Sequence, residues 1–497
     1  MRVLFVALGA ENLAFSLLAP LLEKAGHTVD LAFSASLFND QVISLPTISR
    51  LFNDDHSIHD KAREFRPDVV CFSAFSMNHR RLLKIAGSLR ESTGAKTIFG
   101  GIHPSAVPEL VVREPAVDYV CVGEGETALP MLLERLGRGA LSAPSPNILF
   151  KSPTGEILRG PQLPLHEDLD SLPGFEKDIW RDYLRLDKCY MTISSRGCPI
   201  RCTFCANDLL SSLDGRKSPH FRQRSAEHFL NELKTAKRKY GITFVNIEDD
   251  AFTLDAGWLR KFSDSYRREI GVPFACLSHP LFLDEERIRL LKEAGCVSVD
   301  IGVQSVDESV RKKWLNRPEK NWHIERAVQL LEEARIPYVL DHMLGIPSET
   351  PESQERAWQF YGKLNPSRIN TFWLTYYPGT EIQRIALTDK YLTAEEADKI
   401  NRGHLGPYYG VDVKLPAPVR RLYRSYLLLL HLSPLLPRWI KRKIGAARIA
   451  NLPEGALKTL DFLAQWICFH RHPTADYRRY AAQFWNNFRI FWRRKGG

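Results

Sequence analysis

Three cysteines in this 497-residue chain stand close enough together to bind one inorganic cluster. Cys198, Cys202 and Cys205 follow a Cys-x3-Cys-x2-Cys spacing, whereas the other cysteines are scattered. Three thiolates can each bind one iron of a four-iron, four-sulfide ([4Fe-4S]) cluster, which leaves the fourth iron open to a small molecule. A zinc site is the alternative, but structural zinc usually takes four ligands from paired knuckles, and no second knuckle follows in the sequence. The spacing therefore favours an iron–sulfur cluster with one open iron.

The first part of the chain alternates apolar strands with amphipathic helices. Predicted helices such as Phe15–Lys24 and Arg80–Glu91 have apolar residues near a 3.6-residue spacing. Near-continuous apolar strands joined by helices are typical of a parallel sheet covered on both faces. We therefore predict a doubly wound, Rossmann-like α/β domain over 1–140, which binds ligands at the carboxyl ends of its strands. The predicted strands are Val3–Ala7, Thr28–Ala32, Val69–Ser73, Thr97–Phe99 and Tyr119–Val122.

A second alternation of strands and helices covers 188–385, and the cysteine trio follows its first strand. Ser225 and Asn321 are each expected to cap a helix. Six βα units are fewer than the eight of a closed TIM barrel, so we predict an open, partial (β/α)6 barrel. The Pro-, Ser- and Asp-rich segment 141–187 predicts a linker, and 386–497 predicts a helical, basic region. The predicted barrel strands are Tyr190–Ser194, Thr243–Ile247, Phe274–Leu277, Val297–Gly302, Tyr338–Leu344 and Asn370–Tyr376.

The cysteine segment, with the aromatic Phe204 before the last cysteine, resembles the signature of the radical S-adenosylmethionine (SAM) enzymes. In that family the open iron of the cluster chelates SAM, and one electron cleaves SAM to give a 5′-deoxyadenosyl radical. The resemblance covers roughly 190–385. It implies that Cys198, Cys202 and Cys205 hold the cluster.

The same resemblance implies which residues of the barrel bind SAM. The acidic triplet Glu248, Asp249 and Asp250, after the second barrel strand, resembles the motif that takes the amino group of SAM. Gln304, within the segment VDIGVQS, corresponds to the polar residue near the ribose. Ser278 follows the third strand, where many relatives place a polar group against SAM.

Three loops of the first domain resemble the cobalamin-binding domain of the cobalamin-dependent branch of this superfamily. They follow the third, fourth and fifth predicted strands, where a doubly wound sheet binds its ligand. Two adjacent glycines in the second loop would let the backbone approach a bulky corrin ring. The resemblance implies cobalamin contacts from Ser73, Ser76, Met77, Asn78, Gly100, Gly101, Ile102, His103, Pro104, Gly123, Glu124, Gly125, Glu126 and Thr127.

One part of the cobalamin pattern is missing. The Asp-x-His-x-x-Gly motif, which elsewhere supplies a histidine ligand to cobalt, is replaced by Ala7–Asn12 after the first strand. Most radical SAM relatives also lack it, so we expect Ser73–Asn78 beneath the corrin and His103 near the nucleotide tail. The alternative is a doubly wound domain that has lost its cofactor.

The C-terminal region differs from the rest of the chain in charge. From Pro418 to the end there are 16 Lys or Arg against three Asp or Glu, in a chain of net charge +10. The end of the chain predicts an amphipathic basic helix at an anionic membrane interface; the alternative is that its aromatic stripe packs on the barrel. Nucleic-acid binding is disfavoured, because no nucleic-acid motif accompanies the basic residues. The stripe is Tyr477, Tyr480, Ala481, Phe484, Phe488 and Phe491, flanked by Trp485, Trp492, Arg478, Arg479, Arg489 and Arg493.

Cysteine usage and hydropathy indicate where the protein works. Scattered cysteines without a framework of spaced pairs argue against a secreted disulfide scaffold and favour a reducing compartment. No window reaches the 18 or so apolar residues of a membrane span. We expect a cytoplasmic protein that contacts the inner face of the membrane peripherally.

Together these patterns predict a cobalamin-dependent radical SAM enzyme that methylates an unactivated carbon of a lipid, isoprenoid, tetrapyrrole or other secondary metabolite. The resemblance implies a [4Fe-4S] cluster, SAM and cobalamin as cofactors, and an external electron donor such as flavodoxin or ferredoxin. Oxidative cyclisation or rearrangement with the same cofactors is the alternative. A non-catalytic cobalamin- or membrane-binding protein is the alternative of another class, and the intact cysteine trio argues against it.

Overall fold

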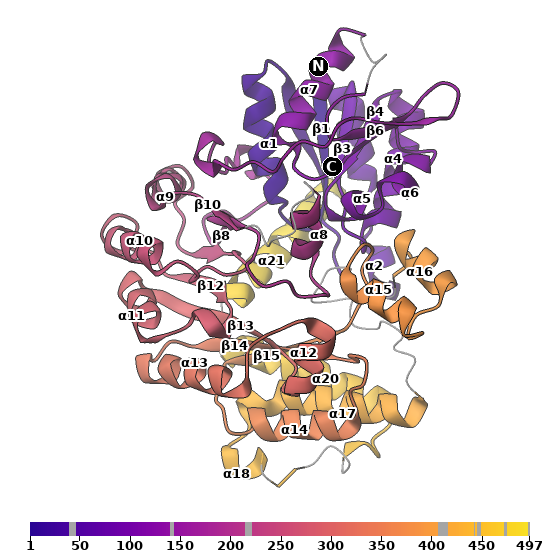
Figure 1. Ribbon diagram of the computed structural model, residues 1–497. Coiled ribbons are helices and arrows are strands. Elements are labelled where there is room, and N and C mark those ends of the chain that lie inside the picture. The colour runs from indigo at the N-terminus through magenta and orange to yellow at the C-terminus, as the bar shows by residue number, and fades with distance from the viewer. Residues whose placement is uncertain are drawn as a thin grey trace.

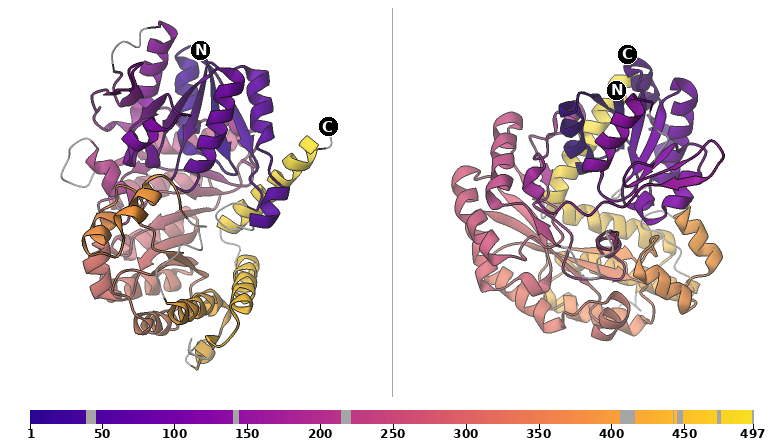
Figure 2. Two further views of the ribbon diagram at one scale, coloured as in Figure 1. Left: turned by 90° about the vertical axis from the view of Figure 1, so that its right-hand side faces the viewer. Right: turned by 45° about the horizontal axis from the view of Figure 1, so that its top comes forward.

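The computed structural model describes residues 1–38, 46–139, 144–213, 221–405, 416–441, 443–444, 449–471 and 475–495. Two α/β units, each built on one large sheet, make up most of the molecule (Figure 1). The last helix runs behind both units, from the second toward the first (Figure 2). The two sheets therefore belong to one compact arrangement that the C-terminal helices help to hold.

The first sheet has seven strands in the order β2-β1-β3-β4-β5-β6-β7. Its first five strands are parallel and confirm the five predicted strands, each a run of apolar residues buried in the sheet. β6 and β7 add an antiparallel hairpin within 141–187, so the prediction of a linker is wrong for these residues. The short run Ile148–Phe150 pairs with β5 and is buried. The strands are β1 (Arg2–Leu8), β2 (Thr28–Ser34), β3 (Val69–Ser73), β4 (Lys96–Gly100), β5 (Tyr119–Cys121), β6 (Ile148–Lys151) and β7 (Ile157–Arg159).

Helices cover both faces of the first sheet. Successive side chains of a strand point to opposite faces, so Phe5 packs with α1 and α7 whereas Leu4 packs with α3, α4 and α6. This arrangement confirms the doubly wound, Rossmann-like domain. The helices are α1 (Leu13–Lys24), α2 (Pro46–Leu51), α3 (His56–Phe65), α4 (His79–Thr93), α5 (Ile102–Ala106), α6 (Pro108–Arg113) and α7 (Gly125–Gly137).

The second sheet has six parallel strands in the order β15-β14-β13-β12-β11-β8. β8 and β15 are its two edges, so the sheet is open, as predicted for a partial barrel. Helices α9, α10, α11, α13 and α14 pack along its outer side, whereas α12 packs in a separate cluster with Met343 and Leu374 (Figure 1). The strands are β8 (Tyr190–Thr192), β11 (Val245–Ile247), β12 (Phe274–Ser278), β13 (Cys296–Gln304), β14 (Tyr338–Leu344) and β15 (Arg368–Trp373), and the helices are α9 (Ala226–Tyr240), α10 (Ala256–Glu269), α11 (Glu285–Ala294), α12 (Glu308–Leu315), α13 (Asn321–Ala334) and α14 (Pro351–Tyr361).

The two predicted helix caps have different outcomes. Ser225 is the N-cap of α9 and accepts a hydrogen bond from the backbone N of His228 at 3.1 Å. Asn321 is the first residue of α13 rather than its cap, and its side-chain amide donates to the backbone oxygen of Val306 at 2.9 Å. Lys320 takes the cap position instead.

The C-terminal region is helical, as predicted, and it contacts both units. α17 packs against α14, β15 and α20. None of the described helices combines the length and apolar character that crossing a bilayer requires. The helices are α15 (Glu381–Thr388), α16 (Ala394–Asn401), α17 (Ala417–Leu432), α18 (Arg438–Lys441), α20 (Glu454–Arg471) and α21 (Ala475–Lys495).

The aromatic stripe of α21 packs on the first domain, and neither on the barrel nor toward a membrane. Phe491 is buried in the core shared with β1 and β2, and its ring lies 5.1 Å from that of Phe52. Phe484 meets the ring of Phe38 at 5.4 Å. The prediction that the aromatic stripe lies in a membrane is therefore wrong, because its phenylalanine rings are packed against the first domain instead. The side chains of Tyr477, Arg478, Arg479 and Tyr480 lie outside the described part of the chain.

Candidate active site

A cavity of about 1790 Å³ lies between the carboxyl ends of the two sheets. The first domain lines it with the loops that follow β1, β3, β4 and β5, and the barrel lines it with residues at the ends of its strands. Parallel α/β sheets bind ligands at this edge. The two sets of loops that the sequence singles out therefore open into one space.

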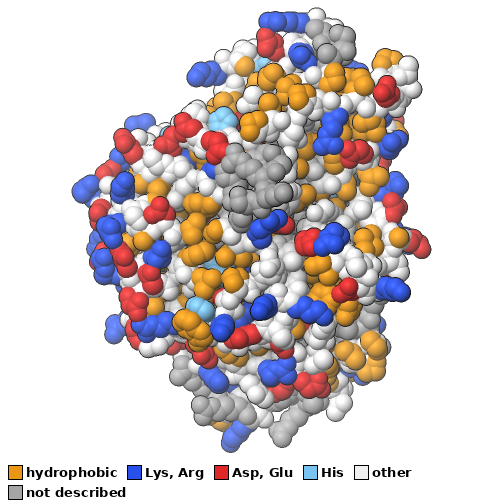
Figure 3. Space-filling model, viewed as in Figure 1, with side chains coloured by type: hydrophobic (Ala, Val, Ile, Leu, Met, Phe, Trp, Pro, Cys, Tyr) orange, Lys and Arg blue, Asp and Glu red, His pale blue; other side chains and the backbone are white. Residues whose placement is uncertain are grey.

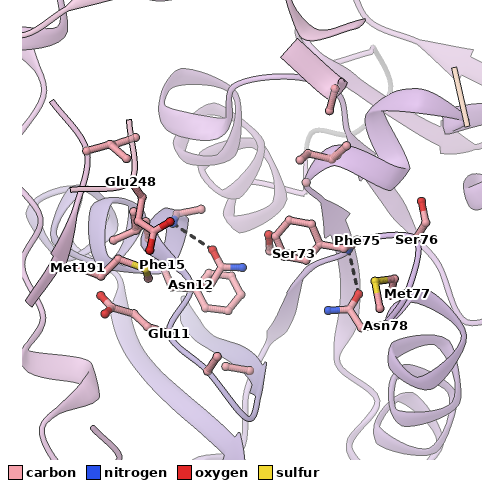
Figure 4. A pocket seen from close by; sticks show the side chains of 18 of the residues that line it. Glu11, Asn12, Phe15, Ser73, Phe75, Ser76, Met77, Asn78, Met191 and Glu248 are labelled. Atoms are coloured by element: carbon pink, nitrogen blue, oxygen red, sulfur yellow. Dashed lines mark hydrogen bonds between the residues drawn. The ribbon is translucent and has the colours of Figure 1, made fainter. Parts of the chain in front are cut away.

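Two walls of this cavity face each other in Figure 4. Glu11, Asn12, Met191 and Glu248 stand on one side, and the β3–α4 loop with Ser73, Phe75 and Met77 stands on the other. Phe75 is 48% exposed and Met77 is 38% exposed, although both are large and apolar. Apolar side chains held open to a cavity form a platform for a large, flat ligand. This arrangement fits the expectation that the loop lies beneath a corrin.

The structure divides the predicted site residues into two groups. Those that line the cavity are Ser73, Ser76, Met77, Asn78, Gly100, Gly101, Ile102, Gly123, Glu124, Gly125, Glu126, Phe204, Cys205, Glu248 and Asp250. The remaining predicted residues, all within the described ranges, are not among those that line the cavity: His103, Pro104, Thr127, Cys198, Cys202, Asp249, Ser278 and Gln304.

The three cysteines lie together in the loop between β9 (Ser195–Arg196) and α8 (Ala206–Ser212). Burial raises the pKa of the Cys198 thiol to about 11 and that of Cys205 to about 12, and the nearby charge of Asp250 contributes to both. No three His, Cys, Asp or Glu side chains among the described residues converge on a position for a single metal ion. A four-iron cluster does not need such convergence, because each thiolate binds a different iron. The soft thiolate set fits an iron–sulfur cluster.

A buried arginine that the sequence did not single out reaches this loop. Arg317 donates to the Sγ of Cys202 at 3.7 Å, to the backbone oxygen of Gly302 at 2.6 Å and to Glu319 at 2.7 Å. His279 stands 3.2 Å from the other oxygen of Glu319. Donors to a ligating sulfur orient it and tune the attached metal. Arg317 lies 115 residues from Cys202 along the chain, so no local pattern connects them.

Two predicted SAM ligands have other partners. Asp249 accepts hydrogen bonds from the backbone N atoms of Ser194 and Ser195 at 2.6 and 3.1 Å, and burial raises its pKa to about 6. It therefore fixes the backbone just before the cysteine loop. The hydroxyl of Ser278 lies 2.5 Å from that of Thr253 and is buried. Within the acidic triplet, the structure leaves only Glu248 and Asp250 on the cavity wall.

Gln304 ends β13 with a backbone conformation that few side chains adopt. Its φ is +65°, and the β13–β14 register shifts between Gly302 and Gln304. Positive φ at a non-glycine residue costs free energy and often marks a functional position. This conformation changes the direction of the chain at the carboxyl end of β13, two residues after Gly302, whose backbone oxygen accepts from Arg317.

Gly101 holds two loops of the first domain in contact. Its φ is +97°, and a Cβ there would lie 2.9 Å from both the backbone N and O of Ala74. The backbone N of His103 donates to the oxygen of Ala74 at 3.1 Å. Behind this wall, the buried His103 ring contacts the hydroxyl of Ser76 at 2.8 Å, and burial lowers its pKa to about 4. The close backbone packing leaves space on the cavity side, which fits a bulky cofactor.

The Gly-Glu-Gly-Glu loop joins the first domain to the barrel. Glu124 accepts from Arg196 at 2.8 Å, from Arg222 at 2.8 Å and from the backbone N of His166 at 2.7 Å. Glu126 pairs with Arg196 at 2.5 Å. Burial alone would raise the pKa of Glu124, but the hydrogen bonds and charges of both arginines outweigh it and lower the pKa to about 2. These carboxylates therefore act first as an inter-domain clamp.

The C-terminal helices complete the cavity. Asn487 of α21 donates to the backbone oxygens of Gly9 and Ala35 at 3.1 and 3.0 Å, so the helix is tied to the carboxyl ends of β1 and β2. A polar residue within an aromatic stripe is the only local signal for this contact. The helices α17, α20 and α21 supply the lining residues His431, Gln465, Cys468, Gln483, Phe484 and Asn487.

Comparison with known proteins agrees with this geometry. A family model described as the radical SAM superfamily matches residues 192–360, and one described as the B12 binding domain matches residues 6–133. The chain is 28% identical to the hopanoid C-3 methylase of Methylococcus capsulatus, over 76% of this chain and 68% of that protein. It is 24% identical to the anaerobic magnesium-protoporphyrin IX monomethyl ester cyclase of Rubrivivax gelatinosus, over 71% of this chain and 62% of that protein.

A solved structure superposes on most of the chain. The radical SAM methyltransferase TsrM of Kitasatospora setae, solved with cobalamin and a [4Fe-4S] cluster bound, superposes with a TM-score of 0.65. The match covers 84% of this chain and 83% of that chain at 20% identity. At this level of identity the likeness shows a common fold.

Proposed function

Because this chain belongs to the cobalamin-dependent radical SAM enzymes, we propose that it transfers a methyl group to an unactivated carbon of an apolar substrate bound between its two sheets. The observation that carries the proposal is that the cysteine loop and the glycine loops of the first domain open into one cavity. When bound, SAM on the cluster supplies a hydrogen-abstracting radical, and cobalamin supplies the methyl group.

Particular residues of this chain would hold these groups. Cys198, Cys202 and Cys205 would bind three irons of the cluster, and Arg317 would orient Cys202. Asp250 lies on the cavity wall beside the thiols, where it would accept hydrogen bonds from the amino group of SAM. An electron would come from a separate donor such as flavodoxin or ferredoxin.

The first domain would hold the corrin through its loops. The β3–α4 loop presents Phe75 and Met77 to the cavity, and Gly101 keeps the β4–α5 loop close behind it. Apolar lining residues such as Phe204, Phe372 and Phe484 support a substrate with large apolar parts. They would also exclude water, which protects a carbon radical from side reactions.

Oxidative cyclisation is a second candidate, favoured by the similarity to a magnesium-protoporphyrin cyclase. The mass of the product separates the two reactions. Incubation with reductant and SAM that carries a deuterated methyl group should give 5′-deoxyadenosine and a substrate enriched in the label. A product that has lost hydrogen and gained no label would favour cyclisation. Product formation that persists in Cys202→Ala would contradict both.

A further inference from the structure

The outward face of α20 is apolar, although it borders solvent. Leu460, Phe462, Leu463, Trp466 and Ile467 are each 43–49% exposed and share one side of the helix. Side chains on its other side, such as Ala464, are buried. Half-exposed large side chains in this number form a patch of roughly a few hundred Å², which is the size of an interaction surface.

The next helix along the chain, α21, also exposes large side chains on one side. Its phenylalanine stripe faces the first domain, so its other side carries Trp485 and Trp492, which are 60% and 52% exposed. Arg489 and Arg493 are exposed on the same side, at four-residue steps from Trp485. α20 and α21, in yellow, run along one edge of the molecule in the left view of Figure 2. Tryptophan with arginine is the residue pair that favours a membrane–water interface.

The C-terminal region has an excess of basic residues, and of the two helices only α21 shares it: α21 holds six Lys or Arg against one Asp, whereas α20 holds two against two acidic residues. Residues 418–497 hold 16 Lys or Arg against three Asp or Glu. On the face shown in Figure 3, by contrast, acidic and basic side chains are interspersed over the barrel helices. The basic, tryptophan-bearing face of α21 is complementary to anionic lipid headgroups, and the apolar face of α20 is complementary to the acyl chains beneath them.

The same two helices also form a wall of the cavity. Gln465 and Cys468 of α20, and Gln483 and Phe484 of α21, line it from the inside. We propose that the outward faces of α20 and α21 dock on an anionic membrane, so that a lipid substrate passes from the bilayer into the cavity beside these helices. The choice of a lipid rests on the proposed function, whereas the docking rests on the surface alone.

Vesicle flotation of the full-length, anaerobically purified protein tests the docking. We expect flotation with vesicles of phosphatidylcholine and phosphatidylglycerol, and much less with phosphatidylcholine alone. The pair Leu463→Gln and Trp466→Gln should lower the partition coefficient about tenfold, because two half-buried interfacial side chains are lost. Trp322→Gln is the matched control, since Trp322 is 59% exposed on α13 and lies outside the proposed surface.

Each outcome decides the matter. Wild type that stays unbound with anionic vesicles, or a double variant that floats like wild type, would overturn the docking. Loss of a dimer in the double variant without vesicles would assign the face to a second copy of the chain instead. Cleavage of SAM by the same samples, measured without substrate, tests the proposed function separately from the docking. A protein that cleaves SAM but does not float rejects only the docking. A protein that floats but does not cleave SAM rejects the proposed function.

Discussion

Neutralising Glu124 should weaken the contact between the two sheets by an amount that the structure sets. Its carboxylate is 20% exposed and accepts hydrogen bonds from Arg196 and Arg222 of the barrel and from His166 of the connecting segment. The two arginines lower its pKa from 4.5 to about 2. A difference of this size corresponds to about 3 kcal/mol of stabilisation of the charged form in the folded protein. Glu124→Gln should therefore lower the free energy of unfolding at pH 7 by most of this amount.

The pH dependence of this loss follows from the direction of the shift. Because the folded-state pKa lies below the ordinary value, the stabilisation is present above pH 4.5 and is lost as the pH falls from about 4.5 to about 2. Urea unfolding of wild type and Glu124→Gln should therefore differ most at neutral pH and converge in acid.

A second carboxylate supplies the control. Glu109 pairs with Arg159, but its side chain is 52% exposed, so Glu109→Gln should cost only about 0–1 kcal/mol. The reasoning is refuted if Glu124→Gln costs no more than this control, or if its cost stays constant across the acidic range.

Two further perturbations test the loops around the cavity. Gly101→Ala should destabilise the fold by about 3–4 kcal/mol, because an alanine there would be strained by the positive φ and its Cβ would lie 2.9 Å from Ala74. Gly26 is the control: its φ is +83° but a Cβ there would meet nothing within 4 Å, so Gly26→Ala should cost only about 1–2 kcal/mol. Equal losses of unfolding free energy in urea would contradict the close contact at Gly101. Arg317→Met removes a cationic hydrogen-bond donor to Cys202, so the midpoint reduction potential of the bound cluster should fall by on the order of 60 mV. Electron paramagnetic resonance during a redox titration measures this potential. An unchanged potential in an intact cluster would show that Arg317 does not tune the cluster.

The sequence predicted most strands because each is a short apolar run between turn signals. β3 and β14 have the predicted bounds, Val69–Ser73 and Tyr338–Leu344. β6 was missed because its apolar core spans only Ile148–Phe150 and follows a Pro- and Ser-rich stretch. Such a run becomes a strand through pairing with β5, which local propensity does not reveal.

Side-chain roles were harder to predict than strands, because they depend on distant partners. Glu124 was recognised by its motif, but its arginine partners lie 72 and 98 residues away along the chain. The aromatic stripe of α21 could not be assigned from its pattern, since a membrane and a protein core both accept a row of phenylalanines. Asp249 lies after β11 as expected, but its carboxylate accepts a hydrogen bond from Ser194 and does not line the cavity.

Anaerobic reconstitution of the full chain with iron, sulfide and cobalamin tests the central claim, that one chain holds both cofactors at a shared cavity. Metal analysis should find about four irons and about one cobalt per chain, and reductant with SAM should yield 5′-deoxyadenosine. Cys202→Ala should lose the iron while keeping the cobalt, because the two sites lie on different sheets. Zinc in place of iron, with no cleavage of SAM, would contradict the account.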